Sequence, residues 1–134
     1  MSKIEQQLEN LAAAMNVQFV YSKRLDVSLN AAWHPATRVI LIRHNLDPAT
    51  RVCAIAHELG HAHYGHDCST PRFEYQADRW AAGQLLNGRV TAELLREYRT
   101  RPGALAAELG VTPGLLNLWL KCGACHTGML DFIV

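Results

Sequence analysis

The chain has 134 residues, of which 49% are hydrophobic, and its formal net charge at pH 7 is +1. This length predicts one compact domain, and the near-neutral charge argues against a polyanion as the main partner. No apolar run approaches the roughly 18 residues of a membrane span, and residues 1–15 lack the apolar centre of a signal peptide. We therefore expect a cytoplasmic protein whose four cysteines are reduced.

An amphipathic helix is predicted over residues 3–15, because apolar side chains recur along one face. Alternating apolar residues then indicate three short strands, at residues 17–21, 31–34 and 38–43. The third strand contains Val39-Ile40-Leu41-Ile42, which is apolar on both faces, so this strand should be central in its sheet.

The second half of the chain is predicted to be helical. The helices are expected at about residues 48–64, 71–86, 92–99, 103–109 and 113–120. Three of them are preceded by an N-cap side chain and a proline, in Asp47-Pro48, Thr70-Pro71 and Thr112-Pro113. The order of helix, strands and then helices predicts an α+β fold with a small, mostly antiparallel sheet of about three strands.

A His-Glu-x-x-His motif occupies residues 57–61, within the first of these later helices. Because four residues make little more than one turn, His57 and His61 project from the same side and can share one zinc ion. Glu58 is then placed to act as a general base on the attacking water. The apolar face of this helix consists of Val52, Ile55, Ala56 and Leu59. The two histidines fall opposite that face, which favours metal binding over a structural role in the core.

A catalytic zinc ion commonly has three protein ligands and one open position. The extended motif with a downstream Gly-x-x-His is not met, although Asp67 stands at the last position of its aspartate variant. A second possibility is Glu74 on the next helix, with Asp78 one turn further on. Asp78 would accept the second N–H of a ligand histidine. His66 is a third possibility, and the spacing favours Glu74.

Residues 47–86 resemble the ImmA/IrrE family of zinc metallopeptidases, which is tied to phage and mobile-element immunity and to stress regulation. The resemblance rests on the zinc motif, on Gly65-His66 after it, and on Glu-Tyr-Gln-Ala-Asp-Arg-Trp-Ala at residues 74–81. That segment matches the E-x-x-A-[ND]-x-[FW]-A pattern of the family. The resemblance implies a zincin-like pair of active-site helices with Glu58 as the base. The zinc ligands that it implies are His57, His61 and Glu74. It also implies a narrow protein substrate, a transcriptional repressor of the helix-turn-helix type.

The leading hypothesis is thus a zinc metallopeptidase. The alternative is a non-catalytic binding protein, similar to an anti-repressor or antitoxin, that is braced by zinc. Glu58 favours the enzyme, because a purely structural zinc site has no use for a base. The sequence does not identify the group that stabilises the oxyanion, and the candidates are His63, Tyr64, His66 and Tyr75. Of these, His63 lies near the apolar arc of its helix and is expected to be buried.

We expect three segments along the chain: a peptidase core at residues 1–88, a helical unit packed on it at 89–121, and a tail at 122–134. Residues 104–120 resemble a helix-turn-helix with Gly110 at the turn. Residues 89–121 have a net charge of only +2, and the would-be recognition helix offers only Lys121. This favours packing or partner docking over DNA binding.

The cysteines do not predict a haem-attachment or metal site. Cys122-Gly123-Ala124-Cys125-His126 matches a haem-attachment pattern, but that attachment belongs to exported proteins, so we expect a reduced tail. A second metal site that also uses Cys68 would have few ligands. Cys53, near the histidine side of the motif helix, is predicted to be structural.

Overall fold

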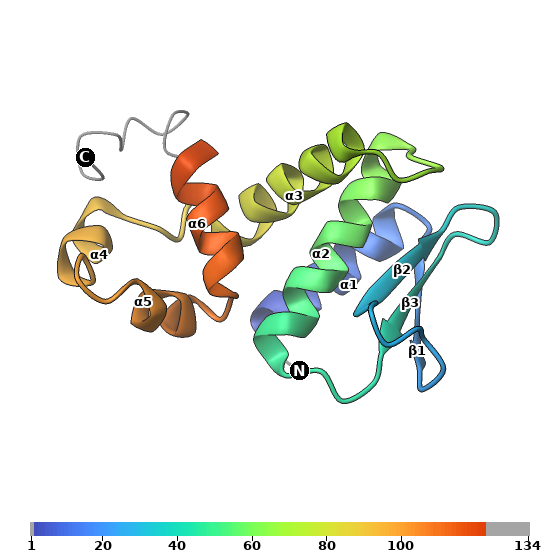
Figure 1. The fold of residues 1–134 in the computed structure, drawn as a ribbon, viewed down its shortest axis with the longest axis horizontal. Helices are drawn as coiled ribbons and strands as arrows, with labels where there is room; N and C mark the ends of the chain where they lie inside the picture. The colour runs from blue at the N-terminus through green and yellow to red at the C-terminus, as the bar shows by residue number, and fades with distance from the viewer. Residues whose placement is uncertain (1, 123–134) are drawn as a thin grey trace.

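The computed structural model describes residues 2–122 (Figure 1). Its elements are α1 (Lys3–Ala14), β1 (Gln18–Ser22), β2 (Ala31–His34), β3 (Val39–Arg43), α2 (Pro48–Tyr64), α3 (Pro71–Leu86), α4 (Ala92–Glu97), α5 (Pro102–Leu109) and α6 (Pro113–Cys122). The predicted α+β class and the order of elements are confirmed. Within the described part of the chain, no helix combines the length and apolar character needed to cross a membrane. Of the tail motif at residues 122–126, only Cys122 belongs to the described part of the chain; positions 123–126 lie outside it.

The three strands form one sheet in the order β1-β3-β2, with β3 in the middle as predicted. The sheet is mixed: β1 runs parallel to β3, and the antiparallel pairing is confined to the hairpin of β2 and β3. Strand β3 begins at Val39 because Arg38 has a φ of 55°, a left-handed conformation that belongs to the turn and not to a strand. Ile40 and Ile42 on β3 are fully buried, and β2 forms one edge of the sheet.

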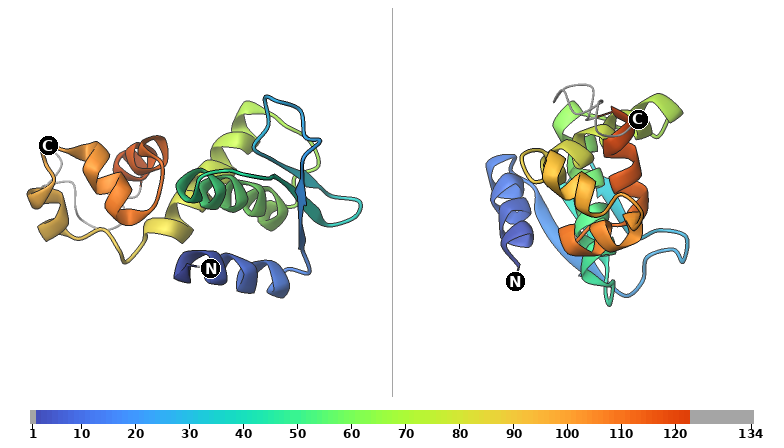
Figure 2. Two further views of the ribbon diagram at one scale, coloured as in Figure 1. Left: turned by 90° about the horizontal axis from the view of Figure 1, so that it is seen from below. Right: turned by 90° about the vertical axis from the view of Figure 1, so that its left-hand side faces the viewer.

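Helices α2 and α3 begin at the side-chain caps that the sequence predicts. The Asp47 carboxylate accepts the N–H of Thr50 at 3.1 Å, and the Thr70 hydroxyl accepts the N–H of Phe73 at 3.1 Å. Helix α2 ends at Gly65, whose φ of 70° is the left-handed conformation typical of a helix end. The two helices lie side by side between the sheet and the C-terminal helices (Figure 2).

Gly60 allows α2 and α3 to approach closely. A Cβ atom at this position would lie 2.9 Å from both the Cα and the carbonyl oxygen of Ala77 on α3. These distances are shorter than van der Waals contacts, so a larger residue would push the helices apart. The second half of α2, which holds the His-Glu-x-x-His motif, is thereby held against the first half of α3.

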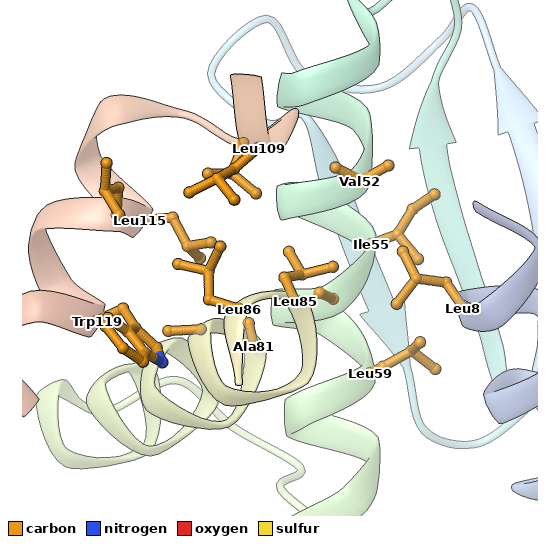
Figure 3. Packing of buried hydrophobic residues seen from close by; sticks show 14 of the residues in the cluster. Leu8, Val52, Ile55, Leu59, Ala81, Leu85, Leu86, Leu109, Leu115 and Trp119 are labelled. Carbon is orange, nitrogen blue, oxygen red and sulfur yellow. The ribbon is translucent and has the colours of Figure 1, made fainter. Parts of the chain in front are cut away.

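The hydrophobic core extends on both sides of α2 (Figure 3). On one side, Leu8 of α1 packs beside Ile55 and Leu59. On the other side, the core residues that join α2 and α3 to the C-terminal helices are Ala81, Leu85, Leu86, Leu109, Leu115 and Trp119. The indole N–H of the buried Trp119 donates a hydrogen bond to Asn87 at the end of α3, at 2.8 Å. Helix α6 is therefore fixed to α3, whereas the segment boundary expected at residue 88 stays a prediction.

Two C-terminal helices end two residues away from their expected ends. Helix α4 ends at Glu97, two residues early, because a turn closed from the N–H of Arg101 to the carbonyl of Tyr98 leads the chain into Pro102. Helix α6 continues to Cys122, two residues beyond its expected end.

Candidate metal centre

Three side chains from α2 and α3 converge on one point. His57 and His61 lie one turn apart on α2, and their Nε2 atoms are 3.1 Å from each other. The carboxylate of Glu74 on α3 reaches both rings. Its Oε1 lies 3.1 Å from Nε2 of His57, and its Oε2 lies 2.8 Å from Nε2 of His61. The sequence-predicted zinc ligands are thus brought together by the close packing of the two helices.

Asp78 holds the opposite edge of the His57 ring. Its Oδ1 lies 2.7 Å from Nδ1 of His57, so the ring donates this N–H to Asp78 and its Nε2 atom faces Glu74. Burial lowers the pKa of His57, but the hydrogen bond and charge of Asp78, helped by the charges of Glu58 and Glu74, raise this pKa to about 9. In the absence of a metal ion the centre therefore attracts a proton, as expected where carboxylates surround a ligand histidine.

Glu58 lies beside the histidines with an unusual ionisation. Burial raises the pKa of its carboxyl to about 7; the charge of His57 and a hydrogen bond from the Trp33 backbone on β2 oppose this shift. Its Oε2 atom is buried and has no hydrogen-bond partner among residues 2–122. A carboxyl with a pKa near neutrality is suited to accept and return a proton.

The donor set suits a metal ion. Ligand atoms of His57, Glu58 and His61 all lie within 4.8 Å of one another. Glu74 also contacts both Nε2 atoms directly, whereas the Glu58 carboxyl accepts a hydrogen bond from the Trp33 backbone. Two imidazoles and one carboxylate form a common ligand set of catalytic zinc sites. The residues fit a zinc ion, although the donor set alone does not identify the metal.

His66 occupies a position that its sequence spacing did not predict. Its ring is buried, and its Nδ1 lies 3.0 Å from Nδ1 of His61, on the side of that ring away from Glu74. Its Nε2 lies 2.9 Å from Oε1 of Gln76 on α3. Both nitrogens of His66 are therefore engaged behind His61. Asp67, the other alternative ligand, is exposed at the rim of a neighbouring cavity.

The other three candidates for stabilising the oxyanion, His63, Tyr64 and Tyr75, make their contacts with groups other than the nitrogen and oxygen atoms of His57, His61 and Glu74 that meet at the centre. The prediction that His63 is buried is wrong: its ring is exposed and stacks on Trp80 of α3, with the ring centroids 5.3 Å apart. The exposed Tyr64 stacks on His66, and the hydroxyl of the exposed Tyr75 lies 3.1 Å from Sγ of Cys122.

Two cavities flank the centre. The first, of about 290 Å³, lies along β2 and contains Glu58, His61 and Glu74 in its wall. The second, of about 390 Å³, lies between α2 and α6, and its wall contains His57 and Asp78. The centre is thus accessible from two sides.

Cys53 also lines the second cavity. Its sulfur accepts hydrogen bonds from the backbone N–H and the hydroxyl of Thr112, at 3.5 and 3.7 Å, and burial raises its pKa. A thiol with a raised pKa is a poor nucleophile, which agrees with the structural role predicted for Cys53.

Comparison with known proteins identifies a family for this chain and a solved structure with a similar fold. Residues 4–121 match the family model of the IrrE N-terminal-like domain, a peptidase family. The fold is similar to that of a Mycobacterium tuberculosis transcriptional regulator, with a TM-score of 0.67 and 20% sequence identity over 88% of this chain and 40% of the regulator. This chain thus spans less than half the length of the regulator, and no curated protein matches it. Since the family model covers most of the sequence, the chain belongs to the IrrE N-terminal-like domain family of peptidases.

Proposed function

We propose that the protein is a zinc-dependent metallopeptidase that hydrolyses a peptide bond of a protein substrate. In this proposal His57, His61 and Glu74 bind the zinc ion, and Glu58 is the general base. The observation that supports it most directly is the meeting of two imidazole Nε2 atoms and one carboxylate within 3.1 Å of each other. A Glu58 carboxyl with a pKa of about 7 lies next to this meeting point.

The chain's own residues supply the proton transfers and the orientation. A bound zinc ion would provide a water of lowered pKa and would polarise the substrate carbonyl. Glu58 removes a proton from the attacking water, keeps it on the carboxyl group, and later donates it to the leaving amine. The hydrogen bond from the Trp33 backbone keeps this carboxyl at the cavity wall. Asp78 keeps the proton of His57 on Nδ1, so that Nε2 is free to bind the metal.

We further propose that the substrate lies along β2 in an extended conformation. Strand β2 pairs with β3 on one side only, and the first cavity runs beside it. Extended peptides commonly add to such an edge through backbone hydrogen bonds. Trp33 of β2 is among the residues that line this cavity, as are Ala31 and Ala32 of the same strand.

The family resemblance favours a helix-turn-helix repressor as the substrate, cleaved selectively in phage or mobile-element immunity or in stress regulation. The C-terminal helices are not proposed to bind DNA. In α6, Leu115, Leu116 and Trp119 are buried, so much of the helix faces the protein. Gly114, Leu115 and Leu118 line the second cavity, where they would contact the substrate beyond the metal.

The test is incubation of the zinc-loaded protein with repressors encoded beside its gene. Glu58→Gln should retain zinc but lose cleavage by about 10²–10⁴-fold, because only proton transfer is removed. Glu93→Gln, which changes an exposed carboxylate on α4, is the matched control and should cleave normally. Equal cleavage by the Glu58→Gln variant would exclude the proposed base. A stable complex without cleavage in the wild type would instead support the zinc-braced binding protein.

A further inference from the structure

We propose that His66 and Gln76 are positioning residues, which orient His61 for metal binding through a directional chain of hydrogen bonds. This inference rests on the proposed function, because it assigns His61 as a ligand through Nε2. It concerns the side of His61 that faces away from the metal, where the sequence suggested no partner.

The direction of these hydrogen bonds follows from the tautomer that a histidine needs in order to bind a metal ion. For Nε2 of His61 to present a lone pair to a metal ion, the proton of the ring must be on Nδ1. The atom that faces this N–H at 3.0 Å is Nδ1 of His66, which must therefore be the acceptor. His66 is then protonated on Nε2, and this N–H points to the Oε1 atom of Gln76 at 2.9 Å. Each donor has one acceptor, and the series of hydrogen bonds ends at the neutral side-chain amide of Gln76.

The surroundings of His66 fix its ring in this position. His61 and His66 are only 7% and 6% exposed, so water has little access to replace either partner. The ring of His66 stacks on Phe73, with centroids 3.9 Å apart and planes 10° apart, and Tyr64 stacks at 5.5 Å. The backbone also contributes, because the left-handed turn at Gly65 lets the N–H of His66 bond the carbonyl of His61 at 2.9 Å.

The two histidine ligands are thus oriented by different chemistry. His57 donates to Asp78, a half-exposed carboxylate, whereas His61 donates to a buried and neutral imidazole. A neutral acceptor orients the ring without adding a second negative charge behind the ligands. Loss of this acceptor would leave the N–H of His61 buried and without a partner, which is costly and allows the ring to turn.

The experiment measures the zinc dissociation constant by competition with a chromophoric chelator. His66→Phe keeps the stacked ring but removes the acceptor, and its zinc affinity should fall about 10–100-fold. His66→Asn places an amide oxygen near the position of Nδ1 and should recover most of this loss. His63→Phe is the matched control, since His63 is also stacked on an aromatic ring but is exposed, and its affinity should not change.

Two further measurements separate positioning from folding. Urea unfolding of each metal-free variant reports folding, and the visible absorption of the cobalt(II)-loaded proteins reports ligand geometry. In His66→Phe the cobalt spectrum should change, and in His66→Asn it should return toward that of the wild type. Wild-type zinc affinity in His66→Phe, or no recovery in His66→Asn, would overturn the positioning role. Failure of the wild type to bind zinc would overturn the proposed function itself, which the same titration reveals first.

Discussion

The contact between α2 and α3 can be tested by replacing Gly60 with alanine. The added Cβ would lie 2.9 Å from two backbone atoms of Ala77 and 3.2 Å from its side chain. Ordinary carbon contacts are about 3.5 Å, so the helices would have to separate by about 0.5 Å. Overpacking of this kind costs roughly 1–3 kcal/mol, and the better helix propensity of alanine offsets about 1 kcal/mol. We therefore expect a net loss of up to about 2 kcal/mol in the free energy of unfolding.

The metal centre should be affected in the same variant. Glu74 and Asp78 lie on α3 on either side of Ala77, so separation of the helices moves both carboxylates away from the histidines. We expect weaker zinc binding together with the lower stability. Gly103→Ala is the matched control, because a Cβ there meets no atom within 4 Å, and its stability should stay equal or rise.

Urea unfolding of both variants, with and without zinc, measures these effects. A Gly60→Ala protein as stable as the wild type, with unchanged zinc affinity, would show that the helix spacing does not depend on this glycine.

Two other predictions follow from the pKa shifts and from the docking of α6. The metal-free protein should lose stability as pH rises from 6 to 9. In the folded state the pKa of His57 is raised from 6.5 to about 9, and that of Glu58 from 4.5 to about 7. Between these values the folded protein binds more protons than the unfolded chain, so the free energy of unfolding falls as the pH rises. Urea unfolding at both pH values should show this, and Asp78→Asn should reduce the difference; stability that rises with pH would refute it. Trp119→Phe removes the donor to Asn87 and should cost about 1 kcal/mol, whereas Trp119→Ala should cost about 3–5 kcal/mol. Thermal unfolding should rank these variants in that order, and equal melting temperatures would contradict the docking contact.

Local sequence signals predicted most of the fold. The N-cap residues Asp47 and Thr70, the prolines after them and Gly65 define helix ends through short-range hydrogen bonds and backbone conformation. The apolar sequence of β3 also predicted its central position. The parallel pairing of β1 was not predictable, because it depends on β3 inserting between two strands that precede it in the sequence.

The candidate site was predicted in part. Helical spacing predicts that His57 and His61 share a side, but the depth of α3 packing depends on the contact of Gly60 with Ala77, which no local pattern reveals. His66 was one of several suggested ligands, and its position behind His61 depends on the turn at Gly65 and on stacking with Phe73. Gln76 was missed, although it lies two residues after Glu74 in the family pattern.

Helix α3 contributes both to the metal centre and to the hydrophobic core, so substitutions far from the centre can affect activity. One side of the helix holds Glu74 and Asp78 at the histidines, and another side holds Leu86 in the core shared with α6. A change that loosens α6 would therefore disturb the carboxylates through a rigid helix without touching the centre. A random screen for inactive variants should return substitutions near Trp119 as well as at the active site.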